Sequence, residues 1–220
     1  MVAQIQDVAK RYMMYQNLLN TIQQLEQSIN AERKAVLQPL IADVQLKVSQ
    51  GKQIHINFIC THNSRRSHLA QIWAQVAAVY FEVPKVYCYS GGTEETALFP
   101  MAAETLAEQG FKIFKIAALG NPVYAIKYSD NALPIIGFSK SYDHPFNPSS
   151  NFVAVLTCSQ ADGGCPFIAG ADLRVPITYE DPKISDGTPQ KAQVYRQRSL
   201  EIATEMFYVF SQIKKKKNAG

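Results

Sequence analysis

The sequence predicts an α/β protein with a doubly wound, four-stranded parallel sheet that follows an N-terminal helical arm. Short apolar segments alternate with helical ones after residue 52, an order typical of parallel sheets. Residues 152–157 (FVAVLT) are almost continuously apolar, as expected for a strand buried on both faces. Apolar residues before position 51 recur at helical spacing instead. We therefore expect an arm over residues 1–51 and a main domain over residues 52–220.

The arm contains two helical patterns. Apolar side chains recur at three- and four-residue spacing over residues 5–29, with Gln and Asn between them. A second helix is expected over residues 32–48, with Gly51 ending it and Pro39 as a site for a kink. Two interpretations remain open. The arm packs on the main domain, which we favour, or its near-heptad spacing forms the seam of a homodimer.

The main domain alternates strands with helices in chain order. We expect strands at residues 54–59, 85–90, 152–157 and 173–177, and helices at residues 67–81, 100–109 and 189–213. Residues 120–151 are rich in Pro, Asn, Ser and Gly and contain two short β-like runs, 123–128 and 133–138, so we predict an inserted hairpin or lid. Ligands of doubly wound sheets bind beyond the carboxyl ends of the strands, and Cys60 and Cys158 both lie at such ends.

The composition argues against several classes of protein. Lys and Arg exceed Asp and Glu by 22 to 18, but residues 214–217 alone supply four cations, and no basic stripe with interleaved aromatics suggests nucleic-acid binding. No apolar segment approaches the ~20 residues that cross a bilayer, and the N-terminal segment lacks a signal-peptide core. We expect a cytoplasmic protein with no membrane partner, in which the four cysteines remain thiols.

Residues 60–67 (CTHNSRRS) place a Cys and an Arg on either side of five residues, between a strand and a helix. A loop of this length can wrap so that its N–H groups point at an oxyanion, and the helix start adds partial positive charge. Arg66 would hold two oxygens with its planar fork, and Cys60 would be the nucleophile, with a thiol pKa lowered by the same groups. The other expected oxyanion-binding residues are Thr61, His62, Asn63, Ser64, Arg65 and Ser67.

Two details of this loop support the interpretation. Asn63 tolerates the left-handed backbone that a tight bend requires, and the hydroxyls of Ser64 and Ser67 can bond the loop or the thiolate. Arg65 and Arg66 stand at a helix N-terminus, where cations are unfavourable unless an anion binds there.

A second pair of cysteines follows the third expected strand. Cys158 ends that strand, and Cys165 comes seven residues later, after a polar linker that contains Gly163 and Gly164. A zinc site needs four ligands, and no further Cys or His is nearby, so we expect no metal. A reducing compartment disfavours a structural disulfide. The remaining functional interpretation is a relay, in which Cys158 reaches the Cys60 loop and Cys165, on a mobile segment, resolves the resulting disulfide.

Residues 59–73 (ICTHNSRRSHLAQIW) resemble the catalytic loop and first helix of the low-molecular-weight protein tyrosine phosphatase superfamily. The resemblance continues at residues 90–93 (SGGT), after the second strand, and at Asp181-Pro182, where that superfamily keeps its general acid. It implies a flavodoxin-like strand order and a general-acid role for Asp181.

One branch of this superfamily, the thioredoxin-coupled arsenate reductases, resembles this chain at three places: Leu156-Thr157-Cys158, Cys165-Pro166 and Glu180-Asp181-Pro182. This likeness implies that Cys60 attacks arsenate, Cys158 attacks Cys60 to release arsenite, and Cys165 attacks Cys158, with thioredoxin reducing the final disulfide. The loop would serve phosphate-ester hydrolysis through a phosphocysteine equally well, because arsenate and phosphate have nearly the same shape and charge. A phosphatase is therefore the alternative. A third interpretation is a non-catalytic protein that binds phosphate or assembles through the helical arm.

Several positions differ from the family pattern. His62 stands where relatives usually have Gly, and Arg65 where they often have Cys, so we expect a bulkier and more cationic loop. Gln71 replaces a Glu that helps to hold a potassium ion in characterised reductases, so we expect no cofactor and doubt potassium dependence. Cys88 alternates with tyrosines in the second strand and is expected to be a buried core thiol.

Overall fold

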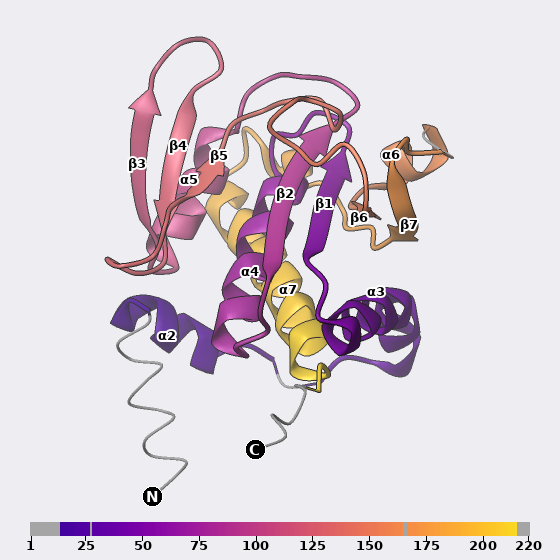
Figure 1. The fold of residues 1–220 in the computed structure, drawn as a ribbon. Helices are drawn as coiled ribbons and strands as arrows, with labels where there is room; N and C mark the ends of the chain where they lie inside the picture. Colours follow the sequence, from indigo (N-terminus) through magenta and orange to yellow (C-terminus); the bar gives the residue numbers. More distant parts are fainter. Residues whose placement is uncertain (1–13, 27, 165–166, 215–220) are drawn as a thin grey trace, which may run out of the picture.

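The centre of the computed structural model is a four-stranded sheet in the order β2-β1-β6-β7 (Figure 1). The structure describes residues 14–26, 28–164 and 167–214. The strands are β1 (Ile54–Cys60), β2 (Val86–Gly92), β6 (Phe152–Leu156) and β7 (Ala171–Pro176). All three pairings are parallel, which confirms the predicted sheet.

The register of the central strands determines where the site lies. Every residue of β6 is buried, and β1 is buried apart from His55, as expected for strands with both faces covered. Cys60 pairs with Gly92 of β2, and Ile59 pairs with Leu156 of β6. The carboxyl ends of β1, β2 and β6 therefore meet at one edge of the sheet, directly before the loops that follow them.

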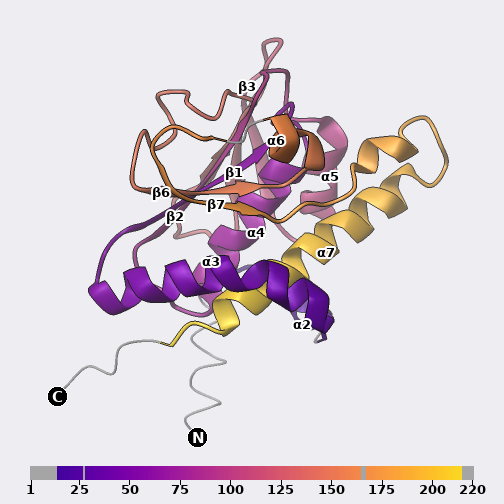
Figure 2. The same cartoon turned by 90° about the vertical axis from the view of Figure 1, so that its right-hand side faces the viewer.

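Three helices match the predicted boundaries within two residues and pack around the sheet. They are α4 (Arg66–Tyr80), α5 (Pro100–Glu108) and α7 (Lys191–Ser211). Helix α4 packs on β1 and β2, and α7 packs on α4 (Figure 2). Trp73 is completely buried at this contact and donates its indole N–H to the Ser199 hydroxyl at 2.9 Å. These contacts anchor α4, whose first residue is Arg66.

The arm forms two helices, α2 (Gln16–Gln23) and α3 (Ala31–Gln50), that pack on the main domain. Leu18, Leu37, Leu40 and Val44 have no exposed surface and belong to the same hydrophobic cluster as the main-domain core. Of the two interpretations of the arm, packing on the main domain is the one that these contacts bear out.

Helix α2 is shorter than the predicted helix over residues 5–29. Among the described residues it begins after Tyr15, whose N–H donates to the Tyr128 carbonyl at 2.9 Å and whose hydroxyl donates to Asp130 at 2.8 Å. These bonds to the insertion hold Tyr15 in an extended conformation. Leu25 and Ile29 pack on the core from a non-helical segment, so their spacing was misleading. Residues 5–13 lie outside the described residues.

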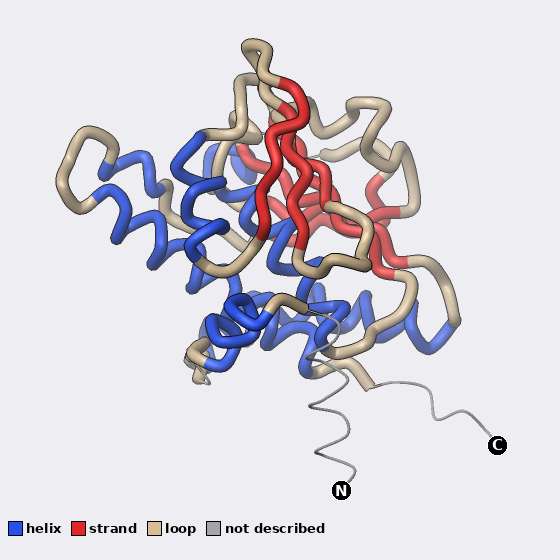
Figure 3. Tube along the Cα trace, turned by 90° about the vertical axis from the view of Figure 1, so that its left-hand side faces the viewer, coloured by secondary structure: helices blue, strands red, loops and turns tan. Residues whose placement is uncertain are grey.

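The insertion and residues 112–117 before it form a second, antiparallel sheet in the order β3-β4-β5 (labelled in Figure 1; strands are red in Figure 3). The predicted β-like runs become β4 (Val123–Lys127) and β5 (Ile135–Gly137). Strand β3 (Lys112–Ala117) was not predicted, because its side chains are mostly exposed and its apolar residues do not alternate. A bridge between Gly92 and Ser141 ties the insertion to the edge of the main sheet.

Candidate active site

The loop between β1 and α4 turns its carbonyl groups outward. The carbonyls of residues 60–62 and 64 accept hydrogen bonds of 2.8 to 3.1 Å from surrounding segments; the donors are Thr93 N, Glu94 N, the Thr96 hydroxyl, the Ser139 hydroxyl and Phe99 N. Among the described residues, none accepts a hydrogen bond from a backbone N–H of residues 61–66. The loop therefore leaves its N–H groups available to a ligand, as an oxyanion-binding loop requires.

Glycine at position 92 is needed for this loop to approach β2. A Cβ atom there would lie 2.7 Å from the Thr61 carbonyl oxygen and 2.8 Å from the Asn63 nitrogen, distances that real Cβ atoms do not adopt. The second strand thus contributes its backbone, and not a side chain, to the support of the loop.

A chain of hydrogen bonds leads from the insertion to the Cys60 thiol. The backbone N–H of Lys140 donates to Asn63 Oδ1 at 2.9 Å, and Asn63 Nδ2 donates to the Ser67 hydroxyl at 2.8 Å. The Ser67 oxygen lies 3.1 Å from Cys60 Sγ. Asn63 has a φ of 41°, which confirms the predicted left-handed bend. A hydroxyl at this position can donate to the thiolate and stabilise it.

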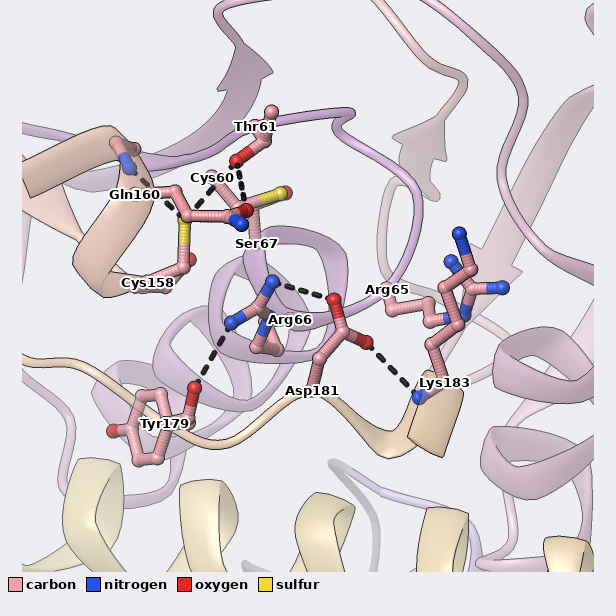
Figure 4. Close-up of polar contacts among 12 residues, drawn as sticks. Cys60, Thr61, Arg65, Arg66, Ser67, Cys158, Gln160, Tyr179, Asp181 and Lys183 are labelled. Atoms are coloured by element: carbon pink, nitrogen blue, oxygen red, sulfur yellow. Dashed lines mark hydrogen bonds and ion pairs between the residues drawn. The ribbon is translucent and has the colours of Figure 1, made fainter. Parts of the chain in front are cut away.

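Arg66 lies next to the segment that contains Asp181 (Figure 4). Its Nη1 donates to the Tyr179 carbonyl at 2.9 Å, and its Nη2 donates to Asp181 Oδ2 at 2.6 Å. Asp181 also accepts from Lys183 N at 3.0 Å, at the start of the 3-10 helix η1 (Pro182–Ser185). The tertiary structure thus brings together the two residues that the sequence placed 115 positions apart.

Arg65 points away from the loop (Figure 4). Its Nε donates to the Tyr195 hydroxyl at 2.6 Å, its Nη2 pairs with Asp186 at 2.9 Å, and its guanidinium lies 4.1 Å from the centre of the Phe99 ring. The expectation of a more cationic loop is therefore corrected for the Arg65 side chain. Its backbone N–H remains a predicted donor to the oxyanion.

The remaining loop residues have different exposures. His62 has a side chain that is 40% exposed and lies 3.1 Å from the Glu94 carboxylate, at the mouth of the loop. Ser64 is buried. A cavity of about 870 Å³ opens beside the loop; it is lined by His62, Arg66, Ser159, Gln160, Thr178, Tyr179, Glu180, Asp181, Lys183 and Ile184.

Cys158 lies against the loop. Its sulfur is 3.5 Å from the Thr61 hydroxyl, and Thr61 in turn donates to Gln160 Oε1 at 3.3 Å. Thr157 N donates to the Ile59 carbonyl at 2.7 Å, which holds the two strand ends together. Cys60 and Cys158 are 3% and 1% exposed and share a small hydrophobic cluster, so both thiols are shielded from solvent.

The linker after Cys158 is a helix, α6 (Ser159–Gly164), and not the flexible segment that we predicted. Arg174 of β7 pairs with the Asp162 carboxylate at 2.5 Å and also bonds its carbonyl, which fastens α6 to the sheet. Cys165, the third cysteine of the predicted relay, lies outside the described residues. Cys88 is buried, as predicted, and burial raises the pKa of its thiol.

Two buried residues beside the loop escaped sequence analysis. Lys140 is only 1% exposed, its ammonium lies 4.5 Å from the centre of the Phe138 ring, and burial lowers its pKa to about 8. His68 is fully buried next to it, and burial, with the charge of Lys140, lowers its pKa to about 3. A lysine in a polar, Pro- and Ser-rich segment gives no sequence signal of burial.

Among the described residues, no three His, Cys, Asp or Glu side chains gather as metal ligands would. No helix among them is long and apolar enough to cross a membrane.

Comparisons with known proteins found arsenate reductases and protein tyrosine phosphatases. No protein-family model matches the chain. The curated arsenate reductase of Staphylococcus aureus (strain Newman) is 30% identical over 153 residues, which cover 69% of this chain and 94% of that protein. Similar solved structures include a low-molecular-weight phosphotyrosine phosphatase from Vibrio cholerae (12% identity, TM-score 0.48, 72% of this chain and 94% of that one) and an arsenate reductase from Archaeoglobus fulgidus (19%, 0.43, 71% and 98%).

Proposed function

This chain belongs to the same family as the curated arsenate reductases, and on that premise we propose that it reduces arsenate with a relay of three thiols regenerated by thioredoxin. The thiols act in the order Cys60, Cys158 and Cys165. Reduced thiols are required at the start of every cycle, which fits the cytoplasmic location expected from the sequence.

The position of Cys158 is the observation that carries this proposal. Its sulfur contacts the Thr61 hydroxyl, one residue beyond Cys60, at the same sheet edge. A phosphatase needs one thiol, because water displaces the phosphoryl group from it. A second buried thiol beside the first has a direct use in a reductase, where it attacks the first sulfur.

The proposed reaction has three thiol steps and a final reduction by thioredoxin. The Cys60 thiolate attacks arsenic(V) and displaces a hydroxide, which leaves as water after protonation. The Cys158 thiolate then attacks the Cys60 sulfur; the S–As bond breaks, its electron pair stays on arsenic, and arsenite leaves as arsenic(III). The Cys165 thiolate attacks Cys158, which releases the Cys60 thiolate and forms a Cys158–Cys165 disulfide. A thioredoxin dithiol reduces that disulfide and supplies the two electrons that arsenic gained.

The residues of the loop supply binding and charge for these steps. The inward N–H groups and the start of α4 face the oxyanion. Arg66 has five N–H donors, and its bonds to Tyr179 and Asp181 use one from each terminal nitrogen, so others remain for the oxygens. Ser67 stabilises the Cys60 thiolate before attack and again when it leaves.

We propose that the reaction needs no potassium ion. Gln71 is neutral, and its amide nitrogen donates to the Cys88 carbonyl at 3.1 Å. The buried ammonium of Lys140 lowers the pKa of the neighbouring His68, so this region already contains a cation. A second cation beside it would meet charge repulsion in a buried environment.

Hydrolysis of phosphate monoesters is the second candidate. The contact of Asp181 with Arg66 favours it, because it places a carboxyl group beside the loop, where a leaving alcohol would need a proton. This reaction would use Cys60 as nucleophile and Asp181 as general acid, with no part for Cys158 or Cys165.

Replacement of Cys165 separates the two candidates. If the relay is correct, Cys165→Ser retains aryl phosphate hydrolysis, if the parent has it, but stops thioredoxin-linked turnover after one arsenate, with a Cys60–Cys158 disulfide visible by mass spectrometry. Cys88→Ala is the matched control, since Cys88 has no part in the relay, and should turn over repeatedly. Parental turnover of arsenate by Cys165→Ser would exclude the relay and favour the phosphatase.

A further inference from the structure

The N-terminal arm contacts residues 178–179, which belong to the segment that accepts hydrogen bonds from Arg66. Arg33, on the first turn of α3, donates from Nε and Nη2 to the two oxygens of Glu205 on α7, at 2.5 and 2.8 Å. The same Nη2 donates to the Thr178 carbonyl at 3.2 Å. Glu205 is 4% exposed, so Arg33 is the cation that makes its burial tolerable.

Tyr179 connects this ion pair to the proposed active site. Its hydroxyl donates to Glu205 Oε2 at 2.7 Å, and the Arg33 guanidinium lies 5.0 Å from the centre of its ring. The carbonyl of the same residue accepts from Arg66 Nη1. Burial and the charge of Glu205 raise the pKa of Tyr179 well above its usual value, so its hydroxyl keeps the proton that it donates.

We infer that Arg33 is a positioning residue, through which the arm sets the orientation of the oxyanion-binding Arg66. Glu205 and Tyr179 are the intermediates: Arg33 orients the Glu205 carboxylate, the carboxylate holds the Tyr179 hydroxyl, and the Tyr179 carbonyl holds Arg66. The inference rests on the proposed role of Arg66 in binding the oxyanion.

The Arg33–Glu205 ion pair would act on the oxyanion indirectly, through residues 178–181. Within the part of the chain that the structure describes, the hydrogen bonds and ring contacts of Arg33 with the cavity lining are those to Thr178 and Tyr179. Its loss would leave a buried carboxylate without its cation, and Glu205 would then reorient or draw in water. Residues 178–181 would lose their fixed position, and Arg66 would bind an oxyanion only after it is ordered again, at an entropic cost.

Binding of inorganic phosphate to the full-length protein, measured by calorimetry, tests this inference without turnover. Arg33→Met keeps most of the side-chain length and removes the charge; we expect phosphate affinity to fall about tenfold. Lys34→Met is the matched control, because Lys34 is the exposed neighbour on the same helix, and its ammonium lies over the Tyr208 ring at 5.5 Å, away from residues 178–181. It should bind phosphate as the parent does. Arg33→Lys keeps the positive charge but lacks the planar guanidinium, and it should recover part of the phosphate affinity.

Arg66→Ala distinguishes positioning from general destabilisation. In that background Arg33→Met should cause no further loss of phosphate affinity, whereas a global defect would add to it. Parental phosphate affinity in Arg33→Met, or a further loss in the Arg66→Ala background, would overturn the inference while leaving the proposed function intact. Failure of the parent itself to bind phosphate or arsenate would instead remove the proposed function.

Discussion

At the scale of single residues, Lys140 is the least expected feature of the site. Its side chain is almost fully buried, and its ammonium lies 4.5 Å from the centre of the Phe138 ring and 5.4 Å from the centre of the Phe146 ring. Its backbone N–H orients Asn63, which positions Ser67 next to the thiol. The aromatic faces offset part of the desolvation of the ammonium. A buried charge beside the loop contributes positive potential where an oxyanion would bind.

Replacement of Lys140 should stabilise the protein in a pH-dependent way. Below about pH 8 the lysine is charged in both states, and the folded state carries the full cost of burial. Between pH 8 and 10.5 the folded state loses the proton first, so that cost decreases as the pH rises. Lys140→Met should therefore raise the free energy of unfolding by up to about 3 kcal/mol at pH 7 and by less at pH 10.

Denaturant unfolding at the two pH values measures this effect. Lys115→Met, at an exposed position of β3, serves as the control and should change little at either pH. An equal gain for Lys140→Met at pH 7 and pH 10 would show that the lysine is uncharged at neutral pH.

At the scale of elements, α6 must change for the proposed relay to operate. Six residues make a marginal helix, and two of them are glycines, the residue least favourable in a helix after proline. The ion pair of Asp162 with Arg174 supports it from β7. Cys165 follows α6 directly in the sequence, so we expect the helix to open when Cys165 attacks Cys158. Low intrinsic stability of α6 is then useful to the reaction.

Stabilisation of α6 should slow the resolving step. A Cβ atom at Gly163 or Gly164 would meet nothing within 4 Å, so alanine fits at both positions. The double replacement should stabilise α6 by about 1–2 kcal/mol and slow thioredoxin-linked turnover by about 5- to 30-fold. Phosphate affinity should not change. Gly120→Ala, at an equally open position in the insertion, is the control. Unchanged turnover in the double variant would show that α6 does not need to open.

At the scale of the whole molecule, the arm is part of the core. Buried side chains of α2 and α3 share one hydrophobic cluster with the sheet and with α7. The polar contact of Arg33 with Glu205 lies at the same interface. Arm and main domain should therefore unfold together.

Two leucines on α3 test this cooperation. Leu40 is fully buried, and Leu40→Ala should lower the free energy of unfolding by about 2–5 kcal/mol. Leu46 is 53% exposed, and Leu46→Ala should lower the free energy of unfolding by much less. Thermal unfolding followed by circular dichroism should show one transition in each variant, shifted only for Leu40→Ala. A separate early transition in Leu40→Ala would show that the arm unfolds on its own.

The sequence by itself determined the sheet, its helices and the Cys60 loop. These are local features: apolar runs mark buried strands, and the spacing of Cys60 and Arg66 between a strand and a helix marks a loop of defined length. The left-handed bend at Asn63 follows from its residue type. Strand ends also indicated that Cys60 and Cys158 share an edge, because parallel strands align their carboxyl ends.

Only the tertiary structure decided which groups meet around that loop. Arg65 and Arg66 are adjacent and chemically identical, yet one pairs with Asp186 and the other with Asp181, because the start of α4 turns them in different directions. The burial of Lys140 and the link from Arg33 to Tyr179 depend on contacts between segments far apart in the chain. Such contacts leave no periodic pattern, since burial of a charge depends on partners that folding brings from elsewhere.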